Sequence, residues 1–158
     1  MNKRELIRRA KTYDSKALAE IHTRYSRQIY DHVYRWTGDR SLAEDLTADV
    51  FMRFLETISS VDSQTSLQTW LYRIAGHLVI EHQRRQPSQS ETPSEDTQNS
   101  ELRQVIRRLP ADQQQVLILK LVEELSNDEI AQILGTTEDS LKELQHRALI
   151  ALRRLMAD

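Results

Sequence analysis

The spacing of apolar residues is the feature that most constrains the fold of this chain. Apart from one polar segment, apolar side chains recur at intervals of three and four residues, which is the period of one face of an α-helix. One run consists of Leu18, Ile21, Tyr25, Ile29, Val33 and Trp36. Only three glycines and three prolines interrupt the 158 residues. We therefore predict an all-α fold.

The clearest local pattern lies in residues 125–155, where two helices are predicted to meet at a tight turn. Ser126 followed by Glu129 is a capping box, in which each residue satisfies a backbone N–H of the other at the start of a helix. Gly135 can adopt the left-handed conformation that ends this helix. Thr136 or Thr137 can then cap the next one. The pattern predicts a helix-turn-helix, and a helical hairpin within a bundle is the alternative.

The second helix of this pair has two distinct faces. Its apolar positions are Leu141, Leu144, Ala148, Leu152 and Leu155. Its polar positions are Lys142, Glu143, Gln145, His146, Arg147, Arg153 and Arg154. A helix with hydrogen-bonding side chains on its outer face can lie in a DNA major groove.

Two small helical domains are predicted, residues 1–86 and residues 101–158. In the first domain the predicted caps and stops are Asn2, Asp14 or Ser15, Gly38, and Ser41 paired with Glu44 in a second capping box. Residues 59–66, SSVDSQTS, form a polar loop before its last helix. In the second domain Val116, Leu117, Leu119, Leu121 and Val122 predict a largely buried helix before the helix-turn-helix.

Residues 87–100 separate the two domains. Their sequence, PSQSETPSEDTQNS, contains no Leu, Ile, Val or aromatic residue, and it has three acidic residues but no basic one. Such a segment cannot bury enough apolar surface to offset the entropy lost on ordering. We predict a flexible acidic linker.

The composition of the chain argues against several classes of function. The net charge is −2, whereas a DNA-binding protein that acts alone usually has a clear basic excess. If this chain binds DNA, another component must supply much of the affinity. The absence of cysteine excludes disulfides and thiolate metal sites. No apolar run reaches the length of a membrane span, so we expect a soluble cytoplasmic protein without membrane insertion.

Two helices of the first domain and the whole second domain resemble one protein family. Residues 43–55, AEDLTADVFMRFL, resemble the core-polymerase-binding helix of bacterial sigma factors of the extracytoplasmic-function (ECF) type. Residues 69–85, TWLYRIAGHLVIEHQRR, resemble the helix of that family that melts the promoter and reads its minus-ten element. Residues 102–155 resemble the domain that reads the minus-thirty-five element. The three matches occur in the family's order and cover nearly the whole chain.

The resemblance implies a subunit that binds core RNA polymerase and directs it to promoter DNA, with an anti-sigma factor as a further partner. It assigns contacts with the upstream promoter element to Thr136, Thr137, Lys142, Glu143, His146 and Arg147. It assigns contacts with the minus-ten element to Trp70, Tyr72, Arg73, His77, Glu81 and Arg84. It assigns core-polymerase binding to Asp45, Asp49 and Arg53.

Several positions depart from the family pattern. The family often has aromatic residues in the loop that here spans residues 59–66, and an aromatic residue where Leu67 stands. His77 and Glu81 occupy positions where Asn and Asp are common, and Leu144 occupies a frequent Arg position. We therefore expect an unusual promoter preference.

Other functions remain to be weighed against this one. His77, Glu81 and His82 could be considered as metal ligands, but their order matches no zinc-hydrolase motif and no third ligand is evident, so we predict neither a metal site nor a cofactor. We also predict no enzymatic activity and no small-molecule substrate. The main alternative is a sigma-like mimic that sequesters an anti-sigma factor without directing transcription. A repressor that uses only the C-terminal domain is disfavoured by the acidic balance.

Overall fold

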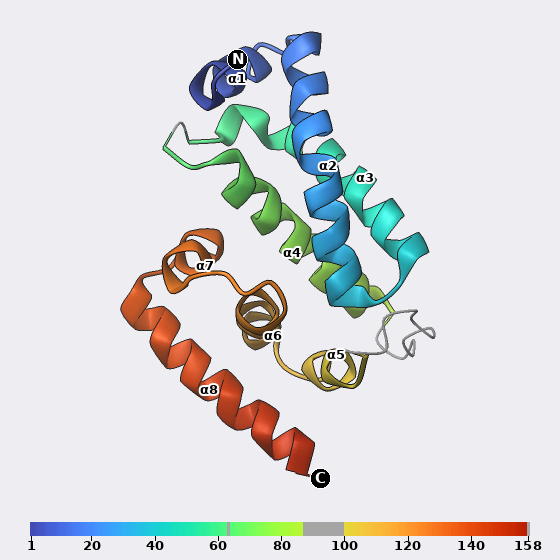
Figure 1. The fold of residues 1–158 in the computed structure, drawn as a ribbon, viewed down its shortest axis with the longest axis vertical. Coiled ribbons are helices and arrows are strands. Elements are labelled where there is room, and N and C mark those ends of the chain that lie inside the picture. The colour runs from blue at the N-terminus through green and yellow to red at the C-terminus, as the bar shows by residue number, and fades with distance from the viewer. Residues whose placement is uncertain (63, 87–99, 158) are drawn as a thin grey trace.

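The computed structural model describes residues 1–62, 64–86 and 100–157, and every regular element within these ranges is a helix. The N-terminal domain contains α1 (Lys3–Ala10), α2 (Ser15–Thr37), α3 (Arg40–Thr57), the short 3₁₀ turn η1 (Ile58–Ser60) and α4 (Leu67–Arg85). The C-terminal domain contains α5 (Ser100–Ile106), α6 (Ala111–Leu117), the π-helical turn η2 (Ile118–Val122), α7 (Asn127–Leu134) and α8 (Glu138–Ala157). Figure 1 shows the two domains as separate groups of helices.

Most helix boundaries follow from local capping. The side chain of Asn2 accepts a hydrogen bond from the Glu5 N–H, and Asp14 caps α2 in the same way through the Lys16 N–H. Gly38 ends α2 in the left-handed conformation, with φ of 72°. These three predictions are confirmed.

The predicted start of α3 is wrong. We expected a capping box formed by Ser41 and Glu44, but the helix begins at Arg40 and its cap is Asp39, which accepts from the Leu42 N–H at 3.1 Å. Asp39 directly follows the left-handed Gly38, and Leu42 lies three residues after it, which is the spacing that Ser41 and Glu44 also have. Asp39 can therefore cap a helix that starts two residues earlier than the predicted one. Ser41 therefore lies inside the first turn and is exposed.

The core of the N-terminal domain is formed where α2, α3 and α4 pack together (Figure 1). Its central residues, all at most 2% exposed, include Ile29, Val33, Val50, Phe54 and Leu71. They lie on the predicted apolar faces. Val61, at 2% exposure, attaches the otherwise polar loop between η1 and α4 to this core.

The predicted helix before the helix-turn-helix is interrupted. α6 ends at Leu117, and the π-helical turn η2 changes the register of the residues that follow. Ile118 and Leu119 are buried, but Leu121, which we expected in the core, is 41% exposed. The five-residue hydrogen-bond spacing rotates each later side chain away from the face that a continuous α-helix would bury.

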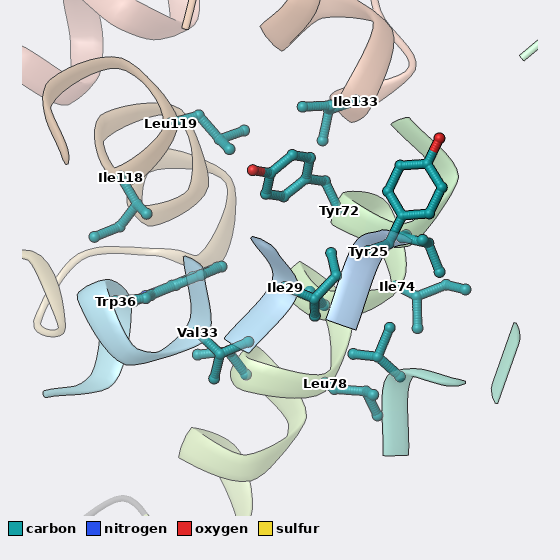
Figure 2. Close-up of a cluster of buried hydrophobic side chains, with 14 of the residues drawn as sticks. Tyr25, Ile29, Val33, Trp36, Tyr72, Ile74, Leu78, Ile118, Leu119 and Ile133 are labelled. Atoms are coloured by element: carbon teal, nitrogen blue, oxygen red, sulfur yellow. The ribbon is translucent and has the colours of Figure 1, made fainter. Parts of the chain in front are cut away.

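The two domains pack against each other. Figure 2 shows Trp36 from α2 and Tyr72 from α4 in one apolar cluster with Ile118 and Leu119 of η2 and Ile133 of α7. All five are at most 4% exposed. The predicted linker, residues 87–100, lies outside the described residues except for Ser100, which begins α5. Among the described residues no helix is long and apolar enough to span a membrane.

Candidate nucleic-acid interface

The helix-turn-helix of α7 and α8 is built as its sequence predicts. The Glu129 N–H donates to the Ser126 hydroxyl at 3.2 Å, and the Ser126 N–H donates to the Glu129 carboxylate at 3.4 Å, which completes the capping box. Gly135 has φ of 69° and ends α7. The hydroxyl of Thr137 accepts from the Ser140 N–H at 3.1 Å and so caps α8. The alternative of Thr136 as the cap is therefore excluded.

The outer face of α8 presents four polar side chains together. Lys142, Glu143, His146 and Arg147 are all exposed, and the described residues offer none of them an ion pair. The opposite face is held in the core by Leu141, Ala148 and Leu152. Gln145 lies between the faces and donates to the Asn127 side chain at 2.9 Å, which fixes α8 against the start of α7. The four exposed groups are available to donate to or accept from a ligand.

The guanidinium of Arg73 in α4 donates hydrogen bonds to the backbone of the C-terminal domain. Its Nε donates to the Ile133 carbonyl at 2.9 Å and its Nη2 donates to the Gln132 carbonyl at 2.6 Å. These are carbonyls of the last turn of α7, where the helix dipole favours a cation. The guanidinium also lies 5.4 Å from the ring centroid of Trp70, which is half-buried. Both residues belong to the predicted minus-ten set.

Tyr72 lies inside the protein rather than on its surface. The side chain is 4% exposed, its hydroxyl accepts from Gln28 Nε2 at 3.1 Å, and its ring meets His32 edge-on at 4.6 Å between centroids. Burial raises the pKa of the phenol above its ordinary value, although the Gln28 hydrogen bond opposes this effect. In this arrangement Tyr72 packs the two domains together and is shielded from any DNA.

The remaining predicted minus-ten residues are more accessible. His77 is exposed and lines a pocket between α4 and the helix-turn-helix, together with Arg73, Gln115, Gly135, Thr136 and Leu144. Glu81 lies 3.7 Å from Arg53 of α3, and both side chains are more than a third exposed. Arg84 is exposed. The structure thus brings Thr136 of one predicted set beside Arg73 and His77 of the other.

The predicted polymerase-binding face of α3 is exposed and acidic. Asp45 and Asp49 lie one turn apart and are exposed, while Leu46 and Val50 point into the core. Within the described residues neither carboxylate has a basic partner. Arg53 follows one turn later and is half-buried beside Glu81. Two unpaired carboxylates on one helical face provide a surface for a basic partner.

Sequence reasoning missed a buried ionic cluster between the domains. Glu123, just after η2, accepts from His32 Nδ1 at 2.5 Å and from the Arg35 Nη2 and Nε at 2.6 and 3.1 Å. Side-chain exposure is 1% for His32 and 5% for Glu123. Burial by itself raises the pKa of Glu123, but the hydrogen bonds and charges of His32 and Arg35 outweigh it, so the pKa lies below its ordinary value. Glu123 is ionised at neutral pH.

Among the described residues no group of three His, Cys, Asp or Glu side chains could hold a metal ion. His77 and His82 are five residues apart on α4 and therefore do not share one face of the helix.

The comparisons with known proteins cover both domains. Residues 21–88 match the family described as sigma-70 region 2, and residues 99–152 match sigma-70 region 4. The chain is 31% identical to the RNA polymerase sigma factor YlaC of Bacillus subtilis, over 89% of this chain and 92% of that protein. It is 30% identical to the ECF RNA polymerase sigma factor SigW of the same organism, over 96% and 95%.

One further relative and two solved structures match different shares of their own length. The chain is 30% identical to the ECF RNA polymerase sigma factor BldN of Streptomyces coelicolor, over 98% of this chain but only 66% of that protein. Among solved structures, CnrH in complex with the cytosolic domain of CnrY has a TM-score of 0.71 and 17% identity, over 98% of this chain and 97% of that one. RpoE in complex with the anti-sigma factor NepR from Bartonella quintana has a TM-score of 0.63 and 22% identity, over 90% and 98%. Both structures share the fold of both domains.

Proposed function

The chain belongs to the ECF group of sigma-70 factors, and on this premise we propose that it binds core RNA polymerase in the cytoplasm and directs it to specific promoters. The observation that carries this proposal is the pairing of the two sigma regions, in their proper order, with a helix-turn-helix that keeps its outer polar face exposed. A sigma factor of this kind is a DNA-binding regulator, and we propose no catalytic reaction of its own.

The exposed face of α8 provides the chemistry for reading the upstream element. Lys142 can donate to guanine O6 and N7, and Glu143 can accept from the N4 amino group of cytosine. His146, one turn after Lys142, extends the same face. Arg147 lies beside these residues and provides a phosphate contact, which positions the helix without selecting sequence. The turn residues Thr136 and Thr137 add hydroxyls at the start of the helix.

The accessible residues of α4 provide the minus-ten surface. His77, Glu81 and Arg84 extend along one side of the helix and combine donors, an acceptor and a positive charge. Arg73 and Trp70 join them once the C-terminal domain moves away. Tyr72 joins them in the same way, since its ring lies in the interdomain cluster that this movement uncovers.

The acidic face of α3 is the proposed contact with core polymerase. Replacing Asp45 and Asp49 together with Lys reverses two charges on an exposed helix, so the free energy of unfolding should change by less than about 1 kcal/mol. Co-purification with core polymerase should fall sharply. The matched control is the Glu101→Lys, Glu138→Lys pair, which makes the same charge change on the C-terminal domain. Equal retention of both double variants would contradict this assignment.

An anti-sigma factor is a further proposed partner. RpoE, which shares this fold, was solved in complex with one. A sigma-like mimic that only sequesters an anti-sigma factor is the second candidate, because the loop before α4 lacks the aromatic residues that usually stack on separated bases. The exposed, unpaired polar face of α8 favours the sigma factor, since a mimic has no need of it.

The decisive test is reconstitution. The chain is mixed with purified core polymerase and genomic DNA of its source, and the 5′ ends of the RNA are sequenced, with core polymerase alone as the control. A sigma factor should produce a discrete set of start sites that share two upstream elements. A mimic should yield the same ends as core polymerase alone.

A further inference from the structure

The first helix, α1, carries an excess of positive charge outside the surfaces assigned so far. This helix and the residue after it contain five basic side chains and one acidic side chain, although the whole chain has a net charge of −2. Arg9 forms an ion pair with Glu5 at 2.9 Å. Arg4, Arg8 and Lys11 are spaced by four and three residues, so they share one face. The described residues offer none of these three an ion pair.

These three cations line an open pocket between α1 and the loop that leads into α4. The pocket has a volume of about 410 Å³, and its other lining residues are Ile7 and Gln64. Ile7 is largely buried and contributes apolar surface. Gln64 is exposed and contributes a side-chain amide that can donate and accept. Sites for small ligands have volumes of roughly 300–1,000 Å³, so the pocket has room for a nucleotide unit.

The stability of α1 does not account for Arg4. This residue lies in the first turn, where the helix dipole favours an acidic side chain and disfavours a cation. The turn is already capped, because the Asn2 side chain accepts from the Glu5 N–H at 2.8 Å. Arg4 also lies one turn before Arg8, and like charges at this spacing repel. Residues that break a local rule in this way commonly mark functional sites, so the pocket requires an anionic ligand to explain it.

The pocket lies next to the proposed minus-ten surface. Gln64 belongs to the loop that precedes α4, and Figure 1 shows α1 and this loop at the same end of the N-terminal domain, away from α5–α8. An anionic membrane fits the pocket less well than nucleic acid does. A helix binds a membrane surface through an exposed apolar face, whereas Leu6, Ile7 and Ala10 of α1 are at most 8% exposed.

We propose that the pocket of Arg4, Arg8 and Lys11 binds the sugar-phosphate backbone of a separated DNA strand beside the minus-ten surface of α4. The inference rests on the proposed function, which assigns that surface to α4. Residues 59–66, before α4, include no aromatic side chain that could stack on a separated base. Cationic side chains that contact phosphate hold a strand without reading its sequence. The pocket thus supplies through charge the grip on the strand that this loop does not supply through stacking.

The test removes two of the three charges. Arg4→Gln combined with Arg8→Gln changes exposed side chains and relieves their repulsion, so circular dichroism should show an unchanged helix content. The matched control is Arg153→Gln with Arg154→Gln, which removes two exposed arginines from the end of α8. Each holoenzyme is titrated from about 50 to 200 mM salt with a promoter fragment whose minus-ten strands are mismatched and therefore already separate.

The expected losses follow from counterion release. Each phosphate contact with a single strand contributes about 0.7 to the slope of log affinity against log salt concentration. Two lost contacts should reduce the slope by about 1.4. If the contribution vanishes at about 1 M salt, affinity at about 0.1 M should fall about 25-fold. The control should match the parent. An equal loss in the control would show a general effect of net charge and would overturn the inference.

Uncharged phosphates locate the contact on the DNA. Single phosphates in either strand of the separated region are replaced one at a time by methylphosphonate. Binding of the parent should weaken at one or two adjacent positions, and the Arg4→Gln, Arg8→Gln variant should be insensitive at these positions. A variant that is as sensitive as the parent there contradicts a contact with the pocket. So does a parent that is insensitive at every position.

A final measurement separates failure of this inference from failure of the proposed function. The free chain is titrated with a labelled single-stranded oligonucleotide of about 20 nucleotides, which requires neither promoter nor polymerase; the slope should again fall by about 1.4 in the variant. This result without discrete start sites in the reconstitution would refute the proposed function and leave the pocket standing. Normal start sites with unchanged slopes would refute the pocket alone. Unchanged slopes with lost binding to vesicles of phosphatidylglycerol and phosphatidylcholine would assign the pocket to a membrane instead.

Discussion

Glu143 gives the sharpest test of how this sigma factor reads DNA. Its carboxylate is exposed on α8, six residues into the helix, and no described residue forms an ion pair with it. It lies beyond the first turn, so its interaction with the helix dipole is small. Alanine is the better helix former by a few tenths of a kcal/mol. Glu143→Ala should therefore leave the free energy of unfolding unchanged to within about 0.5 kcal/mol.

The same substitution should change promoter choice. Loss of an acceptor for cytosine N4 costs about 1–3 kcal/mol of discrimination. At 1.36 kcal/mol per factor of ten, this corresponds to a loss of roughly 5- to 150-fold in preference at one base pair. The assay is transcription by the reconstituted holoenzyme on a promoter library randomised in the upstream element, followed by sequencing of the transcribed templates.

The pattern of selected sequences decides the result. Preference should relax at one position and persist at the others, and Glu101→Ala, on exposed α5 surface, should select the parental sequences. If Glu143→Ala selects the parental sequences as well, the carboxylate reads no base. If instead it weakens all promoters equally, it acts on the helix or on its approach to the backbone.

Two further predictions concern charge. Arg147→Ala should weaken binding to all promoters alike. Loss of one phosphate contact should reduce the slope of log affinity against log salt concentration by about 0.9, measured by titration from about 50 to 200 mM salt. An unchanged slope would show that Arg147 does not contact DNA phosphate. Glu123 faces His32, Arg35 and the Tyr72 hydroxyl, and its pKa is lowered from an ordinary value of 4.5. A lowered pKa stabilises the packing of the two domains fully above about pH 4.5, and this contribution is lost as the pH falls through the lower value. The free energy of unfolding of the parent should thus exceed that of Glu123→Gln by a constant amount above about pH 5, and this difference should vanish on further acidification. A constant difference at low pH would contradict an ionised cluster.

The sequence by itself determined that the chain is helical and, outside the segment that contains η2, which face most helices bury. Caps act within three or four residues, so Ser126 with Glu129 and the left-handed Gly135 could be predicted without knowing the rest of the chain. The exposed polar face of α8 followed from the same periodicity. Asp39 shows the limit of this reasoning, because two adjacent cap patterns competed and the choice depended on how Gly38 ends the previous helix.

Tertiary structure alone decided which polar residues lie inside. His32 and Glu123 are 91 positions apart, and nothing local distinguishes Glu123 from its exposed neighbour Glu124. The π-helical turn η2 sets which side chains face α2, and so buries one carboxylate and leaves Leu121 in water. A charged side chain is stable in the interior only if a group of opposite charge is buried against it. Local patterns cannot show that partner, because it belongs to the other domain.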